Sequence, residues 1–179
     1  MFDFIKEKHR KRVIRNLKAL PRNKRIDNIQ GIMTIGIICR LDDEQNWNIL
    51  NQFAKIMENR GKTVNIIALQ ENKINFCVTN QSTTICRSKS NFNFWGIPSR
   101  ATIKKFTSTH YDLLIDTIGG QNFFSLYIAL RTNASLKVVH ATPAEDPTEI
   151  FDLIIRDDGQ MDLKNYFNNI IKFLEMIKK

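Results

Sequence analysis

The chain alternates short, nearly continuous apolar runs with segments in which apolar residues recur every three or four positions. A short continuous run is typical of a strand that is buried on both faces of a parallel sheet. Such runs occupy residues 32–38, 63–69, 111–118, 136–139 and 150–155. Each of these segments is therefore predicted to be a strand.

Helical spacing fills several of the stretches between these runs. Asp42 and Asp43 supply helix-start chemistry ahead of an apolar series at helical intervals, and Gly61 follows as a stop signal. A second helix is predicted over residues 121–131, and Asp162 is predicted to cap a terminal helix with a broad apolar face. The series after Asp43 consists of Trp47, Leu50, Phe53, Ala54 and Met57.

This alternation predicts an α/β fold in which helices cover both faces of a mostly parallel sheet. The expected architecture is a three-layer α/β/α sandwich, Rossmann-like or flavodoxin-like, preceded by a basic amphipathic helix. Residues 72–106 follow no clear period, and no element is predicted there. The length of 179 residues favours a single domain over residues 31–179, after an amino-terminal arm over residues 1–25.

The arm carries most of the net charge of the chain. Residues 1–25 hold ten Lys and Arg against Asp3 and Glu7, which leaves this segment with +8 of the total of +9. On a helical wheel its apolar side chains form a stripe opposite the cations, and the helix is predicted to end near Pro21. The cations on the helix are Lys8, Lys11, Arg12, Arg15 and Lys18, and Arg22, Lys24 and Arg25 extend the patch.

Three interpretations of the arm stay open. Its apolar stripe packs on the domain while the cations are solvated, or the cations neutralise RNA phosphates, on free RNA or on the ribosome. In the third interpretation the cations meet an anionic membrane surface while Phe2, Phe4 and Ile5 enter the interface. Of the two docking hypotheses, we favour RNA or the ribosome over the membrane surface.

Composition limits the remaining function classes. No apolar run is long enough to span a bilayer, and the basic start lacks the apolar segment of a secretory signal. A cytoplasmic location is therefore expected, peripheral at the inner face of the membrane if the arm binds lipid. Cys39, Cys77 and Cys86 lack the spacing of a metal site, so no metal or cofactor is predicted. No catalytic signature is present, which favours a non-catalytic protein over an enzyme.

One loop suggests an alternative function. Ligands of doubly wound sheets bind outside the carboxyl ends of the strands, here in the loops after Ile38, Leu69, Ile115 and Val139. The third of these loops joins a buried strand to a helix start, where backbone amides can hold a phosphate or a carboxylate. It lacks a complete phosphate-binding motif, and paired glycines in a strand-to-helix turn more often reflect plain backbone geometry. The alternative is a small enzyme that binds a nucleotide or sugar nucleotide. Its candidate residues are Asp116, Thr117, Gly119, Gly120 and Gln121.

Residues 87–100 form a second candidate surface, in which aromatic side chains stand among cations. Phe92, Phe94 and Trp95 could stack on nucleic-acid bases while neighbouring cations follow the backbone. The same spacing also fits a simpler arrangement, in which Phe92 and Phe94 cap the core ahead of a turn. Both interpretations stay open at this point.

Five segments spread along the chain carry a family resemblance. They are the basic helix KEKHRKRVIRNLKAL, the strand IMTIGIIC, the aromatic stretch NFNFWGIPS, the strand YDLLIDTI with its helix, and the closing FDLII strand and helix. Together they resemble a family of short bacterial proteins known only as a domain of unknown function, which implies no activity. Residues 111–139 are also similar to the amino-terminal Rossmann-like half of heptosyltransferase-type glycosyltransferases. Those enzymes bind the nucleotide sugar largely in a second half, for which this chain is too short, so the likeness supports the fold and argues against the activity.

Overall fold

A computed structural model describes residues 2–17, 21–78, 82–142, 149–156 and 161–177. Within these residues, six strands form one sheet in the order β3-β2-β1-β4-β5-β6, and all neighbouring strands are parallel. The strands are β1 (Thr34–Arg40), β2 (Thr63–Gln70), β3 (Thr83–Arg87), β4 (His110–Asp116), β5 (Asn133–Ala141) and β6 (Leu153–Arg156). This is the strand order of a Rossmann sheet and not of a flavodoxin-like one, so the predicted fold class is confirmed.

The two central strands, β1 and β4, are buried on both faces, as their continuous apolar runs predict. They run in parallel with Ile38 opposite Asp116. From β1 the chain continues to β2 on one side of this pair, and from β4 it continues to β5 on the other side. The carboxyl ends of β1 and β4 therefore mark the point where the strand order reverses, which is where such sheets bind ligands.

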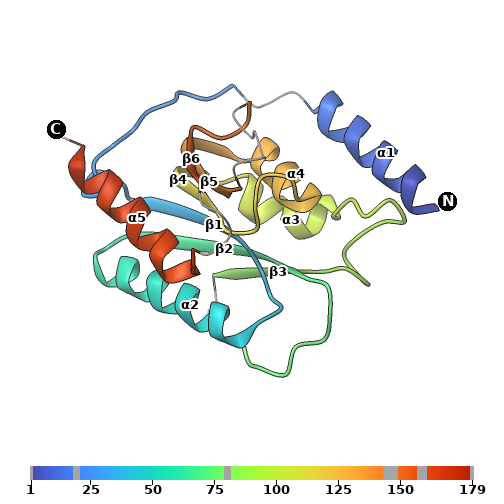
Figure 1. Cartoon of the computed structure of the whole chain (residues 1–179), viewed down its shortest axis with the longest axis horizontal. Helices are drawn as coiled ribbons and strands as arrows, with labels where there is room; N and C mark the ends of the chain where they lie inside the picture. The colour runs from blue at the N-terminus through green and yellow to red at the C-terminus, as the bar shows by residue number, and fades with distance from the viewer. Residues whose placement is uncertain (1, 18–20, 79–81, 143–148, 157–160, 178–179) are drawn as a thin grey trace.

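Helices cover both faces of the sheet (Figure 1). They are α1 (Phe2–Asn16), α2 (Glu44–Asn59), α3 (Arg100–Thr107), α4 (Phe123–Arg131) and α5 (Leu163–Met176). Helices α2 and α5 lie side by side on one face, where Phe53 stacks on Phe167 with ring centroids 4.1 Å apart. Helices α3 and α4 cover the opposite face, and α1 lies outside them in contact with α4. The body is thus a three-layer sandwich with α1 added on one side.

Polar caps begin three of these helices. Asp43 accepts hydrogen bonds from the backbone amides of Gln45 and Asn46, at 3.2 and 2.9 Å, and Asp162 accepts one from the amide of Asn165 at 2.7 Å. Both caps were expected from the sequence, and they satisfy amides that have no partner inside the helix. Helix α4 is capped by Asn122, and it begins at Phe123, two residues after the predicted start.

The structure adds two elements in the region where none was predicted. Strand β3 is a short edge strand with one fully buried side chain, Cys86, and its pattern resembles a loop. Helix α3 has eight residues, of which Ile103 and Phe106 are buried. Both elements are too short to produce a clear period, so they are recognisable only in the context of the fold.

Candidate functional site

Helix α1 is fixed to the body through one side. The side chains of His9, Arg10, Val13, Ile14 and Leu17 are partly buried, and the three apolar ones pack against the core on the α3 and α4 face. His9 stacks on Trp95 with ring centroids 4.3 Å apart, and Nε of Arg10 donates a hydrogen bond of 2.9 Å to the Trp95 carbonyl. The part of the apolar stripe formed by Val13, Ile14 and Leu17 is therefore covered by the protein itself.

The outer face of α1, which we define as Lys8, Lys11, Arg12 and Arg15, is exposed to solvent. Lys11 pairs with Glu7 at 2.7 Å on the helix surface, and this pair lowers the pKa of Glu7. Within the described part of the chain, the other three cations have no carboxylate partner. Lys18, the fifth cation predicted for this helix, lies outside the described residues.

The cations that follow the helix occupy different positions from those expected. The side chain of Arg22 is only 7% exposed and donates two hydrogen bonds to Asp152, at 2.5 and 2.7 Å. Nζ of Lys24 lies 3.1 Å from the same carboxylate, and Arg25 pairs with Asp27 at 2.6 Å. Arg22 is therefore a largely buried structural cation, whereas Lys24 and Arg25 are exposed beside carboxylates, and the role of these two in the patch stays a prediction.

The aromatic candidates are divided between the core and the surface. Phe92 is partly buried and packs against Phe124, with ring centroids 5.9 Å apart. Trp95 is engaged by α1, whereas Phe94 is 65% exposed and has Nζ of Lys6 4.8 Å above its ring. Phe94 is therefore the member of this group whose ring is open to a partner, and it lies beside the amino end of α1.

The loop after β4 begins with a buried carboxylate. Asp116 has no exposed surface, and its carboxylate accepts hydrogen bonds from the Ser125 hydroxyl and from the backbone amides of Ile118 and Gly119. Burial raises the pKa of Asp116 to about 6, although these hydrogen bonds favour the charged form. This carboxylate holds the turn together from inside, and it does not reach a ligand in the crevice.

The other loop candidates face two different hollows. The Thr117 hydroxyl donates to the carbonyl of Ile38 at 3.1 Å, and Thr117 lines a crevice between α2 and α5. Gly119 has a positive φ of 113° and turns the chain toward α4. Gly120 and Gln121 line a separate groove between α4 and α1. The structure does not bring the predicted set together at one point.

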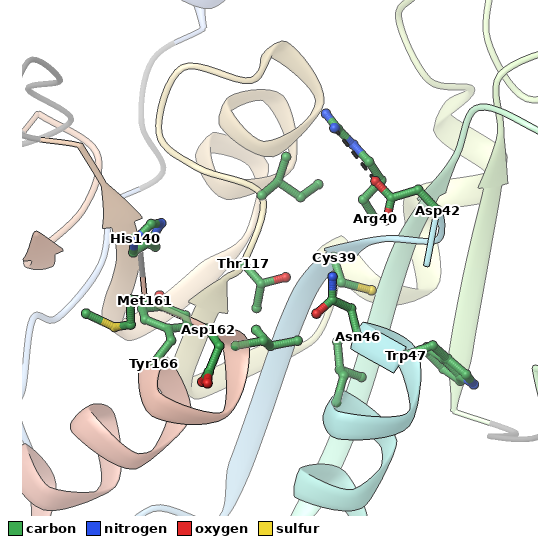
Figure 2. A pocket seen from close by; sticks show the side chains of 13 residues that line it. Cys39, Arg40, Asp42, Asn46, Trp47, Thr117, His140, Met161, Asp162 and Tyr166 are labelled. Atoms are coloured by element: carbon green, nitrogen blue, oxygen red, sulfur yellow. Dashed lines mark ion pairs between the residues drawn. The ribbon is translucent and has the colours of Figure 1, made fainter. Parts of the chain in front are cut away.

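The crevice lies at the point where the strand order reverses, and its volume is about 350 Å³. Figure 2 shows side chains from the ends of β1, β4 and β5 and from the first turns of α2 and α5 around it. Three of the loops expected to bind ligands therefore meet here. The polar lining residues are Arg40, Asp42, Asn46, Thr117, His140, Asp162 and Tyr166.

Carboxylates occupy the helix starts beside this crevice. Asp43 and Asp162 already occupy the amino ends of α2 and α5, where an anion would otherwise bind. Arg40 lies between Asp42 and Glu71, with nitrogen to oxygen distances of 3.9 and 3.6 Å. Its positive charge is therefore balanced on the protein.

Two groups in the crevice are unsuited to nucleophilic chemistry. Cys39 is 2% exposed, and burial together with the charges of Asp42 and Asp116 raises the pKa of its thiol far above the ordinary value. Burial likewise raises the pKa of Tyr166, whose hydroxyl donates to the carbonyl of Asp116 at 2.9 Å. The arrangement is suited to binding a molecule by hydrogen bonds.

The sequence analysis missed Arg40, Asn46, His140 and Asp162 as members of one site. His140 lies near the carboxyl end of β5, next to a loop that was expected to bind ligands, so this signal was present. Asp162 and Asn46 lie in the first turns of two helices that are far apart in sequence, and only the packing of α2 against α5 brings them to one crevice. Among the described residues, no group of His, Cys, Asp and Glu could hold a metal ion, and no helix is long and apolar enough to cross a membrane.

Strand order, layers and crevice define a Rossmann-like α/β protein with a ligand-sized hollow at its switch point. The chain belongs to a family of unknown function, DUF6913, whose model matches residues 6–177. This agrees with the resemblance to an uncharacterised domain family. The comparisons found no match among curated proteins and none among solved structures, and the likeness to heptosyltransferases stays a prediction.

Proposed function

We propose that the protein docks on an anionic partner through the outer face of α1, and that this partner is RNA, either free or in the ribosome. The observation that carries the proposal is the orientation of the helix. Val13, Ile14 and Leu17 pack on the body, while Lys8, Lys11, Arg12 and Arg15 are exposed. A helix held in this way presents its cations as one fixed set, and neutralising phosphates with them releases counterions.

The packing of the carboxyl-terminal part of the apolar stripe favours RNA over a membrane surface. An amphipathic helix that binds lipid inserts its apolar face between the head groups. In α1 that face includes Val13, Ile14 and Leu17, which pack on the body. The exposed ring of Phe94 beside the helix adds a surface on which an unpaired base could stack.

The test compares two double substitutions in the full-length protein. Arg12→Glu with Arg15→Glu reverses two charges on the outer face, and Lys104→Glu with Lys105→Glu reverses two exposed charges on α3. Both variants have the same net charge, so a difference between them reports position. We expect the first to weaken binding to single-stranded RNA about tenfold or more and to flatten its salt dependence, whose slope is about −0.7 per phosphate contact. Equal losses in both variants would contradict the proposal.

Point substitutions are preferable to removal of the arm. A protein that begins at Asn28 would also lack Arg22, and Asp152 would then lose its buried partner. Its failure to bind could reflect unfolding. Fluorescence anisotropy with RNA and sedimentation with ribosomes, each across a salt series, measure the two forms of the proposed partner.

A membrane surface is the second candidate, because two large apolar side chains next to the cations are exposed. Phe4 is 71% exposed and Ile5 is 46% exposed. Substituting both with Ala separates the candidates. If the variant lost binding to anionic vesicles and bound RNA as before, the membrane would be favoured. If the wild type binds RNA and the variant binds vesicles no more weakly than the wild type does, RNA would be supported.

A further inference from the structure

Two hydroxyl groups in the crevice between α2 and α5 can offer only hydrogen-bond acceptors to a ligand. The Thr117 hydroxyl donates to the Ile38 carbonyl, and the Tyr166 hydroxyl donates to the Asp116 carbonyl. The proton of each hydroxyl is therefore engaged in a hydrogen bond to the backbone, and each hydroxyl oxygen can only accept a hydrogen bond from a ligand. A molecule that binds here must supply donors to these oxygens, and also acceptors to the N–H groups of Arg40, Asn46 and Trp47 in the same lining.

The carboxylates around the crevice add to this character. One oxygen of Asp162 caps α5 through the amide of Asn165, and the carboxylate as a whole lines the crevice. Asp42 lies on the opposite rim. A phosphate at neutral pH offers acceptors, and it would face the carboxylates of Asp42 and Asp162, while the amino ends of α2 and α5 are already capped by Asp43 and Asp162.

A cationic ligand is disfavoured by Arg40, which lines the same crevice. Its nearest carboxylates, those of Asp42 and Glu71, balance its charge but lie 3.6 Å or more away. The charges on the lining are thus mixed and locally balanced. Such a lining suits a ligand that has several donors and no net charge.

The size and the apolar part of the lining agree with this chemistry. A volume of about 350 Å³ is in the range of small-molecule sites. Leu50, Ile118, Met161 and Leu163 provide apolar contacts beside the polar groups, and Figure 2 shows Asn46 and Thr117 facing the space between the two helices. Sugar rings and nucleosides combine hydroxyl donors with apolar faces.

We propose that this crevice binds an uncharged molecule with vicinal hydroxyl groups, a nucleoside or a free sugar, and that it discriminates against the phosphorylated forms. The site is separate from α1, so the proposal does not depend on RNA docking. Vicinal hydroxyls donate to Asp162 and to the acceptors at the ends of β4 and α5. The ligand expected here differs from the nucleotide or sugar nucleotide suggested by the sequence of the loop after β4.

The experiment uses the full-length protein and ligand-observed NMR with thermal-shift measurements. The probes are adenosine, uridine, glucose and ribose, with AMP and spermidine for comparison. At least one of the four uncharged probes should bind at millimolar concentration and raise Tm, and AMP should bind about tenfold more weakly than adenosine. If the nucleosides bind and the free sugars do not, the ligand is a nucleoside. If the free sugars bind and the nucleosides do not, the ligand is a sugar.

Two matched variants place the binding in the crevice. Asp162→Asn keeps a helix cap but removes the carboxylate, and should weaken binding of the hydroxyl-bearing probe about tenfold. Asp43→Asn makes the same change at the cap of α2, and its residue is outside the crevice lining, so binding should be unchanged. Failure of all four uncharged probes to bind would overturn the proposal. So would tighter binding of AMP or spermidine, or equal effects of the two variants.

Discussion

The imidazole of His9 stacks on the indole of Trp95, with ring centroids 4.3 Å apart and an angle of 25° between the rings. This contact joins α1 to a loop that follows it by more than eighty residues in sequence. Arg10 reinforces the contact through its hydrogen bond to the Trp95 carbonyl and through its position 5.3 Å from the centre of the Phe123 ring. The orientation of the cations on α1 therefore depends on this small set of contacts.

A substitution next to Trp95 should loosen α1. Gly96 has a φ of 74°, and a Cβ atom there would collide with the Arg10 guanidinium. We expect Gly96→Ala to lower the free energy of unfolding by on the order of 1 kcal/mol through backbone strain, and also to displace Arg10. Hydrogen exchange of the α1 amides should become faster, which mass spectrometry measures.

Gly61→Ala is the control for this experiment. Gly61 has a φ of 77°, and nothing lies within 4 Å of the position of an added Cβ. Its backbone strain is therefore similar, but it cannot disturb Arg10. If both variants accelerated exchange in α1 equally, the proposed role of the Arg10 contact would be wrong.

The fold was largely predictable because its central strands are continuous apolar runs. Residues 32–38 and 111–118 carry enough apolar side chains to indicate a strand without knowledge of the strands that pair with them. These two segments overlap the central strands β1 and β4. The strand order was not predictable, because no local pattern states which strand pairs with which. For the same reason β3 was missed, since it is a strand mainly through its pairing with β2.

The candidate sites were less predictable, because they depend on contacts between distant residues. The helical wheel gave the exposed cations of α1 from local sequence alone. It could not show that Arg22 is buried against Asp152, which follows it by 130 positions. Nor could it show that Asp162 and Thr117 share a crevice, because this requires α5 to pack against the carboxyl end of β4.

The ion pair of Arg22 and Asp152 should be the most important charged contact for stability in the segment after α1. Burial alone would raise the pKa of Asp152, but hydrogen bonds from Arg22, from the Lys137 amide and from Lys24 outweigh it and lower the pKa. Arg22→Met leaves this carboxylate with Lys24, at 3.1 Å, as its ion-pair partner within the described residues. We expect a loss of about 3 kcal/mol at pH 7 in urea denaturation.

The pH dependence of that loss follows from the lowered pKa. A carboxylate whose pKa is lower in the folded state stabilises the protein above its unfolded pKa, here 3.8, and this contribution is lost as the pH falls through the folded pKa. The difference between wild type and Arg22→Met should therefore shrink under acidic conditions. Arg25→Met is the control. It removes an exposed partner of Asp27 and should lower the free energy of unfolding by less than about 1 kcal/mol. Equal losses of stability in Arg22→Met and Arg25→Met would refute the special importance of the Arg22 and Asp152 pair.

Asp116 should produce a pH dependence of opposite sign. Burial raises its pKa from 3.8 to about 6, so the folded protein binds a proton more tightly than the unfolded chain does. Stability from this group falls as the pH rises from about 4 to about 6, by up to on the order of 3 kcal/mol. Asp116→Asn should remove that slope. The measurement is the free energy of unfolding across this pH range in wild type and variant.

Asp112 is the matched control for Asp116, because its environment favours the charge. Burial raises its pKa, but hydrogen bonds from the amides of Met33 and Thr34 and from the Thr34 hydroxyl outweigh burial and lower it. Asp112→Asn should therefore destabilise the protein at pH 7 and have less effect in acid. Parallel curves for the two variants would contradict both assignments.

Lys137 should affect stability at alkaline pH. Its side chain is 2% exposed, and Nζ donates to the carbonyl of Ala129 at 2.5 Å, in the last turn of α4 where carbonyls lack helical partners. Burial, with a smaller contribution from the charge of Arg22, lowers the pKa of Lys137 to about 8.

The sign of this effect is opposite to that of a paired surface lysine. Between about pH 8 and 10.5 the unfolded chain binds more protons at this position, so the stability contributed by the group rises as the pH increases. Lys137→Met should abolish the rise and should cost about 1 to 3 kcal/mol at pH 9, because the Ala129 carbonyl is left without its donor. Lys104→Met, on the exposed face of α3, should change neither quantity. A Lys137→Met variant as stable as wild type at pH 9 would show that the carbonyl finds another donor.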